Sequence, residues 1–161
     1  MMRVRRANYQ DNRMETVPRH NESHYRRADF CLSIHANAAG NRHNVFFGGP
    51  PNIGGHGIET LYQPSTSATH SISRDYADIV QRHVYNFGKK YGQIERSLRI
   101  YPSSATSLLT STLMPTVLTE HGFFTNFREA ILLMDDAYRR GSALALANAI
   151  DEIYAVWKGK M

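Results

Sequence analysis

The 161-residue sequence is poor in cysteine, in long apolar runs and in clustered charge, and each shortage excludes a class of protein. Cys31 is the only cysteine, so an internal disulfide is impossible and a buried, inert thiol is expected. No apolar stretch approaches the ~20 residues that span a bilayer, which excludes a membrane-spanning helix. The basic N-terminus, MMRVRRANYQDNR, has no apolar run behind it and is therefore not a secretory signal.

Basic residues outnumber acidic ones, 19 Lys and Arg against 14 Asp and Glu, which gives a net charge of +5. Such a balance favours polyanionic partners but does not choose among them. The basic residues are scattered as RVRR, YRR, GKK and RR rather than gathered in a block. We therefore expect a solvated basic surface, not a nucleic-acid-binding protein.

The order of strand-like and helix-like segments predicts an α/β fold. Buried strands are expected over 30–35, 57–63 and 113–120, a short extended piece over 98–101, and helices over 71–92, 125–141 and 142–157. In the second strand Ile58, Thr60 and Tyr62 are expected on one face, and Glu59 and Leu61 on the other. The length suits one domain over 1–161, with a sheet covered by helices on both faces.

Two of these strands end on residues that are capable of chemistry, His35 and Glu120. In α/β sheets ligands gather at the carboxyl ends of the strands. A neutral imidazole binds zinc, and a carboxylate takes a proton from zinc-bound water and passes it to a leaving amine. Taken alone, the two residues also fit a hydrogen-bonded core histidine and a helix-capping acid, because two residues do not make a zinc site.

Four strings of residues carry a family resemblance. ADFCLSIHANA, GIETLY, LMPTVLTEHGFFTN and the terminal REAILLMDDAYRRGSALALANAIDEIY occur in order within about residues 17–155. Together they resemble the zinc-dependent N-acetylmuramoyl-L-alanine amidases of type 3, which are peptidoglycan hydrolases of bacteria and phages. The resemblance implies one α/β domain with a twisted, mostly parallel sheet. It also implies hydrolysis of the amide between the lactyl group of N-acetylmuramic acid and L-alanine.

The same resemblance implies one zinc ion held by His, Glu and His, and a separate glutamate acting as general base and acid. His35 matches the second histidine ligand, and Glu120 matches the catalytic glutamate. Asn37 and Glu59 are candidates for substrate binding, although a loop-tying role for Asn37 and a structural role for Glu59 are alternatives. His121, which directly follows Glu120, is expected to point to the opposite face of its strand.

The sequence departs from the family pattern at its N-terminal end. The Asp-x-Gly-His-Gly-Gly strand and the helix that carries the glutamate ligand do not precede SIHANA. The chain thus resembles an amidase domain truncated at its N-terminus, with an incomplete zinc ligand set. His20, His24 and His56 are possible replacements. Three alternatives explain the incomplete ligand set: a misassigned start, a gene fragment, or a degenerate homologue that binds peptidoglycan without catalysis.

The predicted partner is peptidoglycan, bound by a monomer with neither nucleic acid nor a membrane span. From this substrate we expect a location at the cell envelope, in the periplasm or outside the cell. If these 161 residues are the whole product, zinc binding, activity and solubility should be low; if the gene extends upstream, the protein should be an active amidase.

Overall fold

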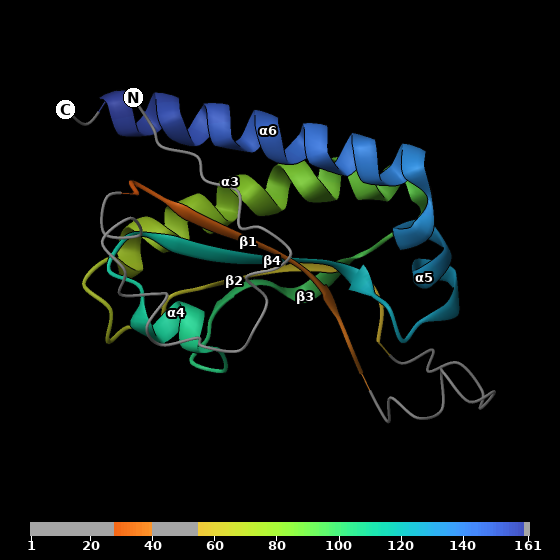
Figure 1. Ribbon diagram of the computed structural model, residues 1–161, viewed down its shortest axis with the longest axis horizontal. Helices are drawn as coiled ribbons and strands as arrows, with labels where there is room; N and C mark the ends of the chain where they lie inside the picture. The colour runs from red at the N-terminus through yellow and green to blue at the C-terminus, as the bar shows by residue number, and fades with distance from the viewer. Residues whose placement is uncertain (1–27, 40–54, 160–161) are drawn as a thin grey trace, which may run out of the picture.

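The computed structural model describes residues 28–39 and 55–159, which fold around a mixed sheet (Figure 1). Its four strands in the described part of the chain are β1 (Cys31–Asn37), β2 (Ile58–Tyr62), β3 (Glu95–Pro102) and β4 (Thr116–Phe123). They lie in the order β1-β4-β2-β3. β1 pairs with β4, and β2 with β3, in parallel, whereas β2 and β4 are antiparallel. The predicted α/β class is confirmed, with two of these three pairings parallel.

Two long helices cover one face of the sheet, α3 (His70–Gly88) and α6 (Asp136–Gly159) (Figure 1). α3 forms because Tyr76, Val80 and Val84 recur at helical spacing and build one apolar stripe. This stripe is buried against Ile58 of β2 and Ile153 of α6 in the main hydrophobic core. The 3-10 turn η3 (Lys89–Tyr91) follows α3 directly.

The opposite face of the sheet carries a smaller apolar cluster and the side chain of Glu59. Leu61 and Leu118 pack there with Leu109 of the short helix α4 (Ser107–Ser111). The side chains of β2 alternate as predicted, since Ile58 and Tyr62 enter the main core while Leu61 joins this second cluster. Burial of one β2 face against α3 therefore turns Glu59 toward the face that α3 does not cover.

The boundary of β4 differs from the predicted one. The strand begins at Thr116 rather than at residue 113, directly after Pro115, which has no N–H to donate to a sheet. It also continues past Glu120 to Phe123, because β1 runs alongside it as far as Asn37. The apolar run that marks a strand in the sequence ends earlier than the strand does.

The C-terminal helices are also divided at a different place. α5 spans Phe127–Met134 and α6 begins at Asp136, so the break falls at Asp135 rather than at Gly141. Asp135 accepts a hydrogen bond from the Tyr138 backbone N–H through its side chain at 2.7 Å. Gly141 stays helical and brings α6 close to α3, since a Cβ there would lie 2.3 Å from the Phe87 ring.

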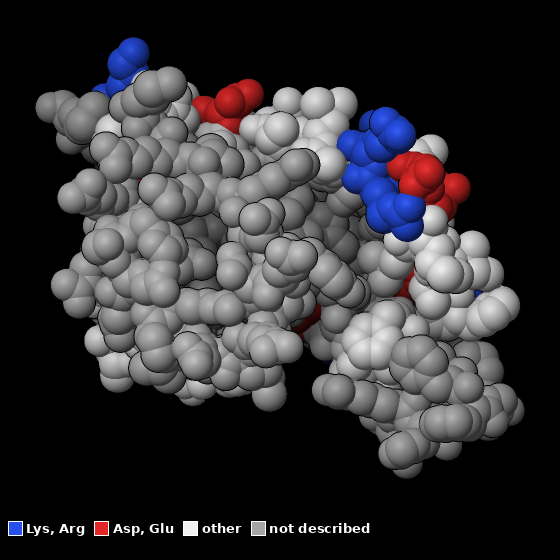
Figure 2. All heavy atoms as spheres, in the orientation of Figure 1, with Lys and Arg blue, Asp and Glu red and all other residues white. Residues whose placement is uncertain are grey.

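The structure also bears on three further predictions, which concern membrane-spanning helices, the Cys31 thiol and the surface charge. None of the described helices combines the length and apolarity that crossing a membrane requires. Burial raises the pKa of the Cys31 thiol to about 11, so this thiol is protonated at neutral pH and unreactive. Figure 2 shows one group of basic side chains next to acidic ones. Among the described residues Arg139 pairs with Asp136.

Candidate active site

The site is built on a row of three side chains that crosses the sheet. Strand register pairs His35 of β1 with Glu120 of β4, and Glu120 with Glu59 of β2. Directly paired residues point to the same face, so the three side chains are neighbours. The sequence placed His35 and Glu120 at strand ends, but both lie inside their strands, two and three residues before the last. Strand residues therefore precede and follow both His35 and Glu120, and their sheet hydrogen bonds hold the backbone of the row.

Glu120 is a buried carboxyl group on β4. Its residue is 9 % exposed, and Oε2 has no hydrogen-bond partner among the residues that the structure describes. Burial, and secondly the neighbouring Glu59 carboxylate, raise the pKa of Glu120 to about 7. A carboxyl group that titrates near neutrality is suited both to accept a proton and to return it.

His35 lies beside Glu120 with an exposed residue surface. Desolvation lowers the pKa of His35 below its ordinary value, so the imidazole is neutral at pH 7. A neutral imidazole is the form that binds a metal ion. His35 is therefore fit to serve as a ligand in the way that the family resemblance implies.

The described residues do not complete a metal site. Within 28–39 and 55–159, no group of three His, Cys, Asp or Glu side chains is arranged to hold an ion. Of the suggested replacement ligands, His56 is exposed and contacts Arg96 through its backbone oxygen, while His20 and His24 lie outside the described residues. His35 thus fits one position of the zinc site.

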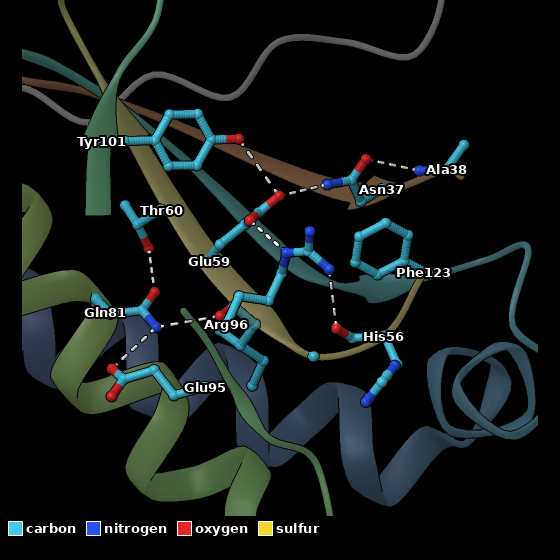
Figure 3. Close-up of polar contacts among 12 residues, drawn as sticks. Asn37, Ala38, His56, Glu59, Thr60, Gln81, Glu95, Arg96, Tyr101 and Phe123 are labelled. Carbon is cyan, nitrogen blue, oxygen red and sulfur yellow. Dashed lines mark hydrogen bonds and ion pairs between the residues drawn. The ribbon is translucent and has the colours of Figure 1, made fainter. Parts of the chain in front are cut away.

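The Glu59 carboxylate is held by three side chains (Figure 3). Oε2 accepts from Nε of Arg96 at 2.5 Å, while Oε1 accepts from Nδ2 of Asn37 at 2.7 Å and from the Tyr101 hydroxyl at 3.4 Å. Glu59 is only 4 % exposed, and these donors offset the cost of burying its charge. The two predicted substrate-binding residues, Asn37 and Glu59, therefore contact each other, and their contact with substrate stays a prediction.

Glu129 of α5 organises the same edge of the sheet, whereas the sequence predicts for it only a place in a capping box. Its spacing from Asn126 indicates a capping box, and Asn126 does cap α5 by accepting from the Glu129 backbone N–H at 3.3 Å. The Glu129 carboxylate bonds elsewhere: Oε1 accepts from the Gly57 N–H at 2.8 Å, and Oε2 from the Phe123 N–H at 2.7 Å. It thus joins the start of β2 to the end of β4.

Gly122 shows why the stretch Glu120–Phe123 within LMPTVLTEHGFFTN contains a glycine. Its φ of +128° is strained for any residue with a side chain. A Cβ at this position would lie 2.8 Å from Nε2 of Gln93 and 3.1 Å from Oε2 of Glu129. Glycine therefore lets the Glu129 carboxylate reach the end of β4.

His121 lies on the other face of β4, as predicted. Its Nδ1 is 2.6 Å from the Ser142 hydroxyl of α6, and the residue is 4 % exposed. Burial lowers the pKa of His121 to about 4, so the ring stays neutral inside the helix layer. His121 is thereby excluded from the face that carries Glu120.

Comparisons with known proteins agree with this fold and motif order. The model of the N-acetylmuramoyl-L-alanine amidase family matches residues 1–152. An endolysin of Bacillus phage SPP1 is 32 % identical over 139 residues, which cover 86 % of this chain and 45 % of that protein.

Solved structures show the same fold. The catalytic domain of CwlV, an N-acetylmuramoyl-L-alanine amidase from Bacillus (Paenibacillus) polymyxa var. colistinus, is 26 % identical with a TM-score of 0.60, over 80 % of this chain and 59 % of that one. Apo Ami1 of Mycobacterium abscessus, 20 % identical, has a TM-score of 0.66 over 86 % of this chain and 61 % of its own. The chain thus spans only about half to three-fifths of these relatives. On the family match and the relatives together, the chain belongs to the N-acetylmuramoyl-L-alanine amidase family.

Proposed function

We propose that the protein hydrolyses the amide between the lactyl group of N-acetylmuramic acid and L-alanine in peptidoglycan. The observation that carries the proposal is the buried Glu120 carboxyl group, with its free oxygen and its pKa of about 7, in register with His35. Family membership supports this choice of amide. A location at the cell envelope follows from the same substrate.

In the proposed reaction Glu120 moves one proton twice. As a carboxylate it takes a proton from the water whose oxygen bonds to the amide carbon. It then donates this proton to the nitrogen as the C–N bond breaks, which releases the L-alanine amine and leaves the lactyl carboxylic acid. The remaining water proton passes from this acid to the amine, which gives the lactyl carboxylate and the L-alanine ammonium group. The paired strands hold Glu120 between His35 and Glu59. Asn37 bonds to Glu59 at the edge of this row.

We further propose that His35 holds the zinc ion that the family resemblance implies. Bound zinc would supply an acidified water molecule at this edge of the sheet. After equilibration with zinc and removal of the excess, metal content should fall in His35→Ala and stay at the wild-type level in the exposed-residue control His56→Ala. Equal zinc content in the wild type and in His35→Ala would contradict this assignment.

Product analysis tests the proposed bond. Incubation with purified cell walls should create new N-terminal alanine, detected by amino-group labelling, without new reducing sugar ends. New reducing ends would indicate a glycosidase instead. Walls that bind the chain but gain neither group would favour the second candidate, a homologue that binds peptidoglycan without catalysis, which the incomplete ligand set among the described residues favours.

A further inference from the structure

Arg96 is a fixed cation beside Glu59, one member of the row of site residues (Figure 3). Its Nε donates to Oε2 of Glu59 at 2.5 Å, and its Nη1 donates to the His56 backbone oxygen at 3.2 Å. Its guanidinium carbon lies 4.9 Å from the centre of the Phe123 ring. Contacts with β2, with the residue before Gly57 and with β4 thus fix the orientation of this side chain.

The Arg96 guanidinium retains donors for a ligand. Among the described residues only Nε and one hydrogen of Nη1 are engaged, although a guanidinium has five N–H donors. The side chain is 35 % exposed, so part of it is in contact with solvent. A guanidinium keeps its proton at all working pH values and matches a carboxylate with two parallel hydrogen bonds.

The position of Arg96 relative to Glu120 suggests which part of a substrate it meets. Arg96 lies on β3 and Glu120 on β4, with only β2 between them. Two strand spacings amount to ~10 Å, and an extended peptide advances ~3.5 Å per residue. With L-alanine leaving from Glu120, the next residue of the peptide arm comes within reach of the long Arg96 side chain.

We propose that Arg96 binds a free carboxylate carried by the residue that follows L-alanine in the peptide arm of the substrate. This inference rests on the proposed amidase function and makes the enzyme selective for acidic, non-amidated peptide arms. Glu59 takes no part in binding that carboxylate; it is the positioning residue that holds the Arg96 fork by Nε. The substrate would then replace water on the outer nitrogens.

The test compares two soluble muramoyl tripeptides that differ only in this group on the residue after L-alanine, a free carboxylate or its carboxamide. Wild-type enzyme should show a kcat/KM roughly tenfold or more higher for the carboxylate, as a hydrogen-bonded charge pair predicts. Arg96→Gln should bring the ratio near one. Arg99→Gln is the matched control on the same strand and should keep the wild-type ratio, because Arg99 pairs with Asp78 and Glu95.

Each outcome decides between the proposals. Equal kcat/KM of the wild type for both substrates, or an unchanged preference in Arg96→Gln, overturns the role of Arg96 and leaves the amidase function standing. No cleavage of either substrate by the wild type overturns the amidase function and this inference with it. If Arg96→Gln does not fold, the wild-type ratio and Arg96→Lys decide; lysine keeps the charge but lacks the fork, so the preference should fall.

Discussion

Glu120→Gln is expected to lower kcat for amide hydrolysis by ~10²- to 10⁴-fold, the usual contribution of a positioned general acid–base group. Glutamine keeps the volume of Glu120 and cannot carry the proton between water and leaving amine. The measurement is the initial rate of amine release at saturating substrate. Glu95→Gln is the matched control and should retain wild-type kcat, since Glu95 bonds to Gln81 and Arg99 away from the row.

The same substitution should stabilise the metal-free protein. The pKa of Glu120 is raised to about 7, so the folded chain holds this proton more tightly than the unfolded chain does. The free energy of unfolding of the wild type therefore falls as pH rises from the ordinary glutamate pKa of 4.5 through about 7. Glutamine does not titrate, so the variant lacks this loss. With chelator present, the free energy of unfolding of Glu120→Gln should be ~2–3 kcal/mol larger than that of the wild type at pH 8. At pH 4 the difference should be small.

Measured stability that is equal in the two proteins at pH 8, or a gain that shrinks as pH rises, would contradict this account of Glu120. Loss of activity together with loss of stability would indicate a structural carboxylate. The predicted combination of less activity and more stability is the signature of a charge buried for catalysis.

Glu129→Ala is expected to destabilise the fold by ~2–4 kcal/mol in denaturant unfolding. The substitution removes the acceptor for two buried backbone N–H groups, those of Gly57 and Phe123. Activity should fall as well, because Phe123 packs on Arg96 and ends the strand that carries Glu120.

The control for this prediction is Glu152→Ala on α6. Glu152 is 36 % exposed and pairs with Arg82 and His83 on the surface, where such pairs contribute at most ~1 kcal/mol. A loss in Glu129→Ala no larger than in Glu152→Ala would show that the two N–H groups do not depend on Glu129.

The sequence predicts those features that local patterns encode. The alternation in β2 and the apolar stripe of α3 depend on residues close in the chain, and the structure confirms both. The predicted break at Gly141 is wrong: glycine often ends a helix, but Gly141 lies inside α6, where the Phe87 ring leaves no room for a Cβ.

In the site, too, local patterns predict some residues and tertiary contacts bring in the others. His35 and Glu120 were singled out by their motifs, and the parallel pairing of β1 with β4 places them side by side. Glu59 joins the row only because β2 is antiparallel to β4, a pairing that no local pattern predicts. The contacts of Arg96 and Glu129 likewise join segments separated by 37 and 72 residues.

Hydrolysis in ¹⁸O-labelled water tests the central claim most directly. If the row of His35 and Glu120 hydrolyses the muramoyl amide, mass spectrometry should find one ¹⁸O in the lactyl carboxylate of the released muramic acid and none in the peptide. Glu120→Gln should release ~10²- to 10⁴-fold less of this labelled product in the same time. Label in a peptide carboxylate or at the sugar anomeric carbon, or as much labelled product from Glu120→Gln as from the wild type, would contradict the claim.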